Sequence, residues 1–356
     1  LVHGLNGGDA FFARMGATVT ERTFCGEGSC TAWLLTIGPT AGVDPESFIH
    51  SKFIVVWACN SVSTNLHHWH IIKEAQKSGA KVVVIDSYAS RTAKEADWHV
   101  CPKPGTDGAL AMAMMNVIIE ENLVDQDYVD NYTVGFKELA EKAKERTPEW
   151  AEDITGISAE DIRQLAREYA TTQPSAIRIG VALEKSWGGS QAIRAVTALP
   201  ALTGAWRHVG GGILQFPVWE HPYKFDVICR PDLIPEGTQV VNNLQLGRVL
   251  TGEQKLNVPI KSMMCWNTNP VTQATESEKI LEGLKREDLF LVSAEHFISD
   301  TAAFADILLP SSIIRFTIAS SGVSPLSSAA SAIVIPLYLF CLLYTSDAAD
   351  EGLGVD

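Results

Sequence analysis

Positive charge is scarce in this chain of 356 residues. Lys and Arg together number 28 against 42 Asp and Glu, which leaves a formal net charge of −14 at pH 7. Phosphate backbones and anionic membrane surfaces attract proteins through clustered Lys and Arg side chains. The composition therefore argues against nucleic acid as a partner.

Cysteine is also sparse, and its spacing is irregular. The chain lacks the regular pairs of a zinc ribbon or a small disulfide-bonded scaffold, so most of its cysteines are expected to be buried thiols. The seven cysteines are Cys25, Cys30, Cys59, Cys101, Cys229, Cys265 and Cys341.

Three familiar signals are missing. No G-x-G-x-x-G fingerprint follows an expected strand, which argues against a conventional nicotinamide dehydrogenase. The apolar run 332–344 contains Pro336 and is shorter than the about 20 residues that a membrane-spanning helix needs. The sequence opens without Met or a signal-like segment. We therefore expect a fragment without its natural N-terminus, and a periplasmic or cytoplasmic location depends on the missing part.

The chain does contain a repeated alternation of strand and helix patterns. Its 46% hydrophobic and 20% charged residues suit a packed α/β protein, and its length predicts two domains. We predict an α/β fold of two doubly wound, mainly parallel sheet units with helical connections. The first unit, with a helical extension, is expected over 1–174 and the second over 175–312. The architecture is expected to repeat, although the two sequences do not.

Apolar runs and amphipathic patterns place the individual elements. Polar helices between 124 and 174 are expected to cover or connect the units, and 303–310 to turn into a last strand. The expected strands are 53–58, 81–86, 97–102, 175–183, 261–266 and 289–295, and the main expected helices are 66–79, 107–123, 188–204 and 274–287.

The end of the chain differs in character from the rest. Residues 341–351, CLLYTSDAADE, resemble the translation of one reading frame of a transposase sequencing adapter. We therefore leave 341–356 out of the fold prediction, and expect the whole tail 313–356 to be non-native.

Polar residues follow the expected strands at positions that suit a nucleotide. Asp86 ends one strand, where its carboxylate can accept hydrogen bonds from ribose hydroxyls or a guanine edge. Asn60 follows the preceding strand, and Gly105, Thr106 and Asp107 open a helix whose N-terminal amides suit a phosphate. The alternative is purely structural, because Asp86 can cap a turn and Thr106 with Asp107 can form an ordinary N-cap.

Five stretches together resemble the molybdopterin oxidoreductase family, the dimethyl sulfoxide reductase superfamily, over roughly residues 1–312. PGTDGAL and DTAAFADILLP are the most specific parts. In family order the stretches are WACNSVSTNLHHW, AKVVVIDSYASRTAKEADWHVCPKPGTDGALA, ALPALTGAWRHVGGGI, NTNPV and KREDLFLVSAEHFISDTAAFADILLPSS.

The resemblance implies part of a larger catalytic subunit that binds molybdenum or tungsten through two molybdopterin guanine dinucleotides. A [4Fe–4S] cluster is implied in the missing N-terminal region, because the clustered cysteines that would hold it are not in this chain. One guanosine is matched by Asn60, Asp86, Gly105, Thr106 and Asp107, and the other by Asn267, Asn269, Asp300 and Thr301.

The resemblance also implies a protein ligand to the metal in the neighbourhood ERTFCGEGSCTAWLLTIG. Cys25, followed by Gly-Glu-Gly-Ser, looks like the cysteine form of that loop. Thiolate sulfur suits such a metal, while the structural alternative is an inert thiol. Three nearby histidines, in the pattern H-H-x-H from His67 to His70, cannot all lie on one helix face and are not expected to bind metal.

The implied function is redox chemistry or oxygen-atom transfer on a small substrate. Electrons would pass to or from a partner, expected to be an iron-sulfur subunit, and membrane association would come only through such a partner. The alternative is a noncatalytic relative of the same fold in a respiratory complex. Retention of both guanosine motifs and of Cys25 weighs against that alternative.

Overall fold

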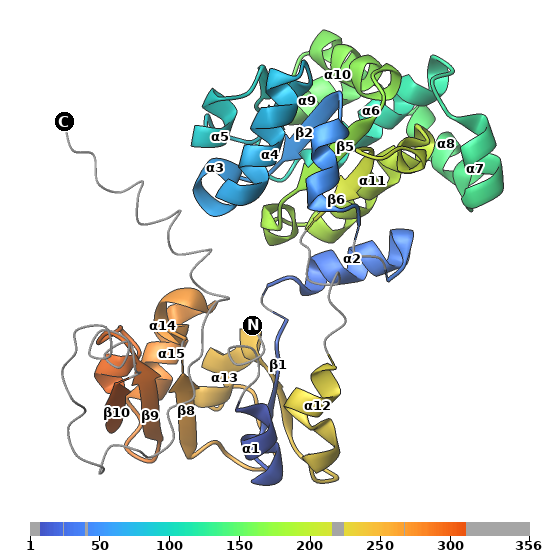
Figure 1. The fold of residues 1–356 in the computed structure, drawn as a ribbon. Helices are drawn as coiled ribbons and strands as arrows, with labels where there is room; N and C mark the ends of the chain where they lie inside the picture. Colours follow the sequence, from blue (N-terminus) through green and yellow to red (C-terminus); the bar gives the residue numbers. More distant parts are fainter. Residues whose placement is uncertain (1–7, 24, 40–41, 216–223, 267, 311–356) are drawn as a thin grey trace, which may run out of the picture. The chain divides into compact units, whose positions relative to one another are not determined.

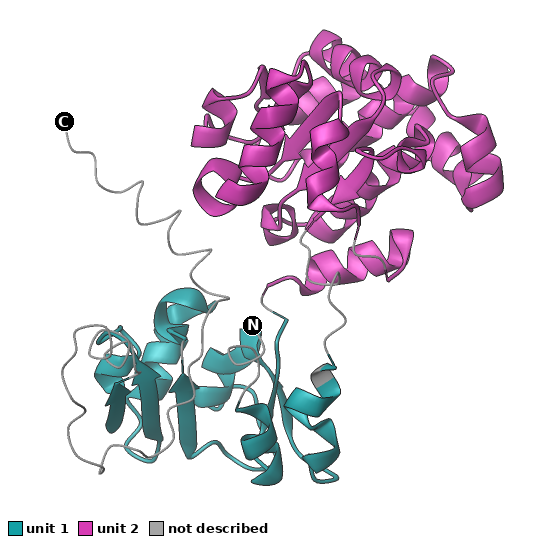
Figure 2. Ribbon diagram, in the orientation of Figure 1, with its two compact units in different colours: residues 1–24, 223–356 teal, residues 25–222 magenta. Residues whose placement is uncertain are grey.

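A computed structural model describes residues 8–23, 25–39, 42–215, 224–266 and 268–310. The chain divides into two compact units (Figure 2). Unit 1 comprises residues 1–24 and 223–356, and unit 2 comprises 25–222. The expected tail and its apolar run lie outside the described residues, among which no helix is long and apolar enough to cross a bilayer.

Unit 2 is built on a five-stranded sheet in the order β4-β3-β2-β5-β6, with every neighbouring pair parallel. Every residue of β2 is buried, as expected for a parallel sheet that is covered on both faces. The strands are β2 (Phe53–Trp57), β3 (Lys81–Ile85), β4 (Trp98–Val100), β5 (Ser175–Ile179) and β6 (Gly212–Leu214).

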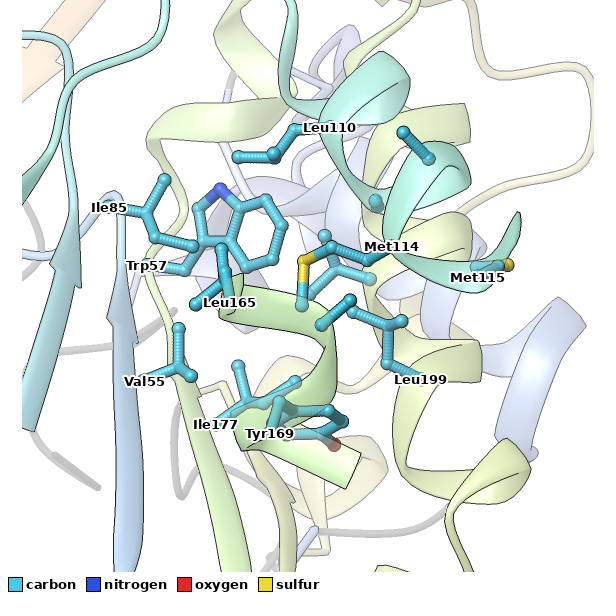
Figure 3. Close-up of a cluster of buried hydrophobic side chains, with 14 of the residues drawn as sticks. Val55, Trp57, Ile85, Leu110, Met114, Met115, Leu165, Tyr169, Ile177 and Leu199 are labelled. Atoms are coloured by element: carbon cyan, nitrogen blue, oxygen red, sulfur yellow. The ribbon is translucent and has the colours of Figure 1, made fainter. Parts of the chain in front are cut away.

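Helices cover both faces of this sheet (Figure 1). Figure 3 shows Trp57 of β2 close to Leu110 and Met114 of α6 and to Leu165 of α10. Fully burying an apolar side chain of this size contributes about 1.5–3 kcal/mol. The helices are α2 (Glu27–Ile37), η1 (Pro45–His50), α3 (Ser61–Thr64), α4 (Leu66–Lys77), α5 (Arg91–Lys94), α6 (Asp107–Glu120), α7 (Gln126–Tyr132), α8 (Phe136–Lys144), α9 (Pro148–Thr155), α10 (Ala159–Thr171), η2 (Ala182–Lys185), α11 (Gly189–Leu202) and η3 (Ala205–Arg207).

The expected boundary after residue 174 falls inside this sheet. β5 was expected to open a second unit, but it pairs with β2 along its whole length, with Ser175 opposite Phe53. All five residues of β5 are buried, so the strand suits the middle of a covered sheet. The chain instead changes unit twice, between residues 24 and 25 and between residues 222 and 223.

Unit 1 contains a three-stranded parallel sheet, in the order β10-β9-β8, and a separate pair of β1 with β7. A smaller core lies between the larger sheet and α13, α14 and α15. The elements are α1 (Asp9–Arg14), β1 (Val19–Glu21), α12 (Phe225–Cys229), η4 (Pro231–Leu233), β7 (Val240–Asn242), η5 (Asn243–Gln245), α13 (Leu246–Leu250), β8 (Ser262–Trp266), α14 (Pro270–Gln273), α15 (Ser277–Leu284), β9 (Phe290–Glu295), η6 (Ala302–Phe304) and β10 (Ile307–Pro310).

One side-chain hydrogen bond occurs in both units at the same sequence separation. In unit 2, Thr92 Oγ1 donates to Asn60 Oδ1 at 2.8 Å, 32 residues earlier. In unit 1, Thr301 Oγ1 donates to Asn269 Oδ1 at 2.7 Å, also 32 residues earlier. We call each of these pairs an Asn–Thr clasp.

A second bond repeats in the same way. The Asp97 carboxylate accepts from the Val82 amide at 2.7 Å, and the Asp306 carboxylate accepts from the Leu291 amide at 2.7 Å, in both cases 15 residues apart. The register of β2 against β3 is also the same as the register of β8 against β9. The architecture is thus repeated, as expected, and 53–100 corresponds to 262–309 without insertion or deletion, with Asn, Thr and Asp kept at the positions of these two bonds.

Candidate functional site

The candidate site of unit 2 lies at the carboxyl edge of its sheet, where the order of the strands places β3 and β5 on opposite sides of β2. Such a switch point is where ligands bind in doubly wound folds. The loops after β2 and β5 touch here, because an ideal Cβ on Gly180 would lie 1.8 Å from the Ala58 carbonyl oxygen. Ala58 has a φ of 50°, which costs a non-glycine residue about 1–2 kcal/mol. The two loops therefore fix each other in place.

Asn60 follows β2 and forms the clasp with Thr92. Its Oδ1 accepts from the Thr92 amide at 3.4 Å as well as from the hydroxyl. The same hydroxyl accepts from the Val62 amide at 2.9 Å. The oxygen of Asn60 therefore holds the loop, and its Nδ2, 3.5 Å from the Tyr88 hydroxyl, is the atom left for other contacts.

Asp86 follows β3 and is half-buried. Burial raises the pKa of its carboxyl, although hydrogen bonds from Ser87, Ser90 and Tyr88 and the charge of His99 act in the opposite direction. His99 Nε2 lies 2.9 Å from the Asp86 carbonyl oxygen. The carboxylate is therefore held at the strand end in a turn that provides several of its donors.

The turn at Gly105, Thr106 and Asp107 leads into α6. Gly105 has a φ of 78°, and an ideal Cβ there would lie 3.3 Å from the Ser186 Cβ. Thr106 occupies the N-cap position without a side-chain cap, because its hydroxyl donates to the Lys103 carbonyl at 2.6 Å. The purely structural alternative of an ordinary N-cap at Thr106 is therefore not what the fold contains.

Asp107 is the acidic residue of the first turn of α6. Its Oδ1 accepts from Trp57 Nε1 at 2.8 Å. Burial raises the pKa of its carboxyl, and the Trp57 bond opposes that rise. A carboxylate is thereby fixed at the same sheet edge as Asn60 and Asp86.

Cys25 is exposed and lies directly before the N-terminus of α2. Gly26, the N-cap residue, has a φ of 84° and offers no side chain for capping. The cap comes from the loop after β5, because the Glu184 carboxylate accepts from the Gly26 amide at 2.5 Å and from the Ser29 amide at 2.8 Å. Cys25 is thus joined to the switch-point edge of unit 2.

In unit 1 the predicted residues gather around the second Asn–Thr clasp. Asn269 Oδ1 also accepts from the Thr301 amide at 3.1 Å, and its Nδ2 donates to Asp300 Oδ2 at 3.4 Å. Asp300 is exposed, whereas Thr301 is fully buried and its hydroxyl also accepts from the Val271 amide. Thr301 therefore supports Asn269 from within the protein. Asn267 lies outside the described residues.

The repeat identifies a residue that the sequence reasoning missed. Glu295 ends β9 in the place that Asp86 takes after β3, and it is half-buried. The counterpart of Asp300 in unit 2 is Arg91, a basic residue. Counting along the ungapped repeat from Asn269 would have found Glu295, which makes it the acidic counterpart of Asp86 in unit 1.

The three histidines of the H-H-x-H pattern differ in burial. His67 and His70 are exposed, whereas His68 is buried against Phe48, and burial together with the charge of Arg178 lowers the pKa of His68 to about 3. Among the described residues, no group of three His, Cys, Asp or Glu side chains is arranged to hold a metal.

The fold defines a doubly wound α/β protein with polar residues at a strand end in each unit. A family model described as "Molybdopterin oxidoreductase" matches residues 9–314. The chain therefore belongs to the molybdopterin oxidoreductase family, and the expected family and fold class are confirmed.

Individual proteins agree with this assignment. The "Probable oxidoreductase YoaE" of Bacillus subtilis (strain 168) is 43% identical over 301 residues, 84% of this chain and 44% of that protein. "Dimethyl sulfoxide reductase DmsA" of Escherichia coli (strain K12) is 31% identical over 312 residues, 76% of this chain and 38% of that protein. The solved structure of acetylene hydratase from Pelobacter acetylenicus has a TM-score of 0.72 at 25% identity, covering 87% of this chain and 47% of that one. The chain thus spans less than half the length of these relatives.

Proposed function

We propose that the complete protein carries one molybdenum or tungsten ion on two molybdopterin guanine dinucleotides and performs redox chemistry or oxygen-atom transfer on a small substrate. The observation that carries this proposal is the repeat: each unit offers an Asn–Thr clasp beside a strand-end carboxylate. Two copies of one dinucleotide need two similar sites. When bound, the cofactor supplies a metal that changes oxidation state.

In unit 2 the residues suit the guanosine end of one dinucleotide. Asp86 would accept from the ribose hydroxyls, as acidic residues at strand ends do. With Oδ1 held by Trp57, Asp107 would accept from the guanine edge through Oδ2. Gly105 and Thr106 would bring backbone amides close to phosphate.

In unit 1 the second dinucleotide would meet Asn269, Asp300 and Glu295, with Thr301 acting through Asn269. Glu295 takes the ribose-binding position because it corresponds to Asp86. Asn267 joins this set by its resemblance to the family motif. The two units share an Asn amide, a Thr hydroxyl and a strand-end carboxylate.

Cys25 would supply the protein ligand to the metal. An exposed thiol in a turn held at the sheet edge is suited to that task, since thiolate sulfur prefers soft metals. Electrons would pass through a [4Fe–4S] cluster in the N-terminal region of the complete protein and then to or from an iron-sulfur partner subunit.

Metal and nucleotide analysis of the purified complete protein tests the proposal. We expect one molybdenum or tungsten for every two guanine nucleotides, whereas a metal-free protein would favour the noncatalytic alternative. Cys25→Ala is expected to abolish turnover while removing less of the cofactor, and Cys101→Ala, at another exposed cysteine, is the matched control. Unchanged turnover in Cys25→Ala would remove the ligand assignment.

A further inference from the structure

Glu184 is a buried carboxylate in η2, the turn that follows β5. Its side chain is only 4% exposed, and Lys185 Nζ lies 2.6 Å from its Oε1. The two oxygens also accept from the amides of Gly26 and Ser29, which are 158 and 155 residues away in sequence. Such a carboxylate is seldom buried without a specific task, because removing a charge from water costs several kcal/mol.

The amides that Glu184 binds belong to the first turn of α2. That turn lacks a local cap, since its N-cap residue is Gly26, and four amides at a helix start need partners. The helix also packs closely against α11, because an ideal Cβ on Gly28 would lie 2.8 Å from Ser190 Oγ. The start of α2 therefore takes its position from the loop after β5 and from α11.

The charge of Glu184 contributes to this arrangement. Burial alone would raise its pKa, but Lys185 and the donors of Gly26 and Ser29 together bring the pKa below its ordinary value. Glu184 is thus ionised at neutral pH, and hydrogen bonds to a charged acceptor are stronger than those between neutral groups.

The location of Glu184 connects this cap to the candidate site. Its loop follows β5 at the switch point, and Ser186 in the same loop contacts Gly105. One short segment therefore contacts both the turn that leads into α6 and the turn that carries Cys25. The position of Cys25 relative to the sheet edge depends on it.

We infer that Glu184 is the positioning residue of Cys25: its carboxylate binds the start of α2 and so holds the thiol at the sheet edge. The functional importance of Glu184 rests on the proposed role of Cys25 as the metal ligand. The hydrogen-bonding role itself does not depend on the metal, so the two can be tested separately.

The test uses the complete protein in its cofactor-free form, with Glu184→Gln and Glu184→Ala. Gln keeps the shape but offers a single acceptor oxygen, and Ala removes both. Loss of one bond of this strength corresponds to about a tenfold or larger change in an equilibrium. We expect amide hydrogen exchange over residues 26–30 to be about tenfold faster in Gln and faster again in Ala. Alkylation by iodoacetamide reports separately on whether each variant stays folded.

Two other cysteines serve as internal controls. Cys101 is exposed and should react at the wild-type rate, whereas Cys59 is buried and should stay protected as long as unit 2 is folded. If Cys59 reacts in Glu184→Ala, that variant has unfolded and the Gln variant decides.

Wild-type amide exchange over residues 26–30 in a folded variant would overturn the inference. A metal-free wild-type protein would overturn the proposed function alone, because the exchange rates of the α2 amides would still report on Glu184.

Discussion

Asp107 is a half-buried carboxyl group that accepts a hydrogen bond from Trp57. It is the acidic residue at the start of α6, a helix of 14 residues with a largely buried apolar face. Burial raises the pKa of its carboxyl, and the bond from Trp57 offsets only part of this. A residue that costs stability at neutral pH is a candidate for binding, and our proposal assigns it the guanine edge.

Asp107→Asn should therefore stabilise the protein at neutral pH. Because the carboxyl has a higher pKa in the folded chain than in the unfolded one, the folded state holds the proton more tightly. Its contribution to stability is then lost as the pH rises from the unfolded value of about 3.9 through the folded value. Asn cannot ionise and can still accept from Trp57, so we expect a higher urea midpoint than wild type at pH 7 and little difference at pH 3.

Glu120→Gln is the matched control for this charge change, since Glu120 is an exposed acid on the same helix. Its urea midpoint should follow that of the wild-type protein at both pH values. A lower midpoint for Asp107→Asn at pH 7 would contradict the argument and would mean that the ionised carboxylate stabilises the fold.

The Asn–Thr clasp is the smallest element that both units share, and it permits the same experiment twice. Thr92→Val and Thr301→Val keep the shape of the side chain but remove the hydroxyl that bridges an Asn oxygen and a Val amide. Each change leaves one buried Val amide without a partner, at about 1–3 kcal/mol, and removes one of the two hydrogen bonds to the Asn oxygen, at about 0.5–1.5 kcal/mol. We expect each variant to lose about 2–3 kcal/mol of unfolding free energy in urea titrations of the complete protein.

Serine at the same positions keeps the hydroxyl and loses only a methyl group. Thr92→Ser and Thr301→Ser should therefore lose clearly less unfolding free energy than the Val variants. If the Val and Ser variants lose the same unfolding free energy at either position, the clasp does not stabilise that unit.

The local sequence pattern predicted which segments are strands and which are helices. It did not predict which strands pair with each other. The runs at β2, β3 and β9 are apolar and rich in β-branched or long aliphatic residues, which is enough to predict strands. β6 was missed because it is a three-residue strand that begins at a glycine. The pairing of Val19 in β1 with Val240 in β7 joins distant parts of the chain, and no local signal encodes it.

The same limit, that a local pattern does not reveal distant partners, explains which residues of the candidate site were predicted and which were missed. Asp86 and Asp107 were predicted because each stands directly at the end of a strand or the start of a helix. Glu295 was overlooked in favour of Asp300, since the repeat that makes it the counterpart of Asp86 became visible through the strand register and the hydrogen bonds of the structure. Glu184 was not predicted either, because its partners are 155 and 158 residues away.

The molecule as a whole is acidic, with a net charge of −14, yet the proposed ligands carry phosphates. Binding therefore depends on backbone amides and on hydrogen bonds to sugar and base rather than on a basic surface. In our proposal each unit holds one end of the same metal cofactor, so loss of either site should weaken retention of the metal.

Three substitutions in the complete protein test whether both sites contribute to retention of the metal. They also test which of the two acidic residues of unit 1, Glu295 or Asp300, contributes more. Asp86→Asn and Glu295→Gln each remove hydrogen bonds to a charged acceptor, worth about 1.5–3 kcal/mol, and should weaken cofactor retention by about tenfold or more. Asp300→Asn changes an exposed residue whose counterpart is Arg91 and should change retention less than Glu295→Gln does, although our proposal places both residues at the second dinucleotide. Metal content after dialysis, measured by mass spectrometry, separates these outcomes. Greater loss in Asp300→Asn than in Glu295→Gln would show that the repeat does not extend to the ligand.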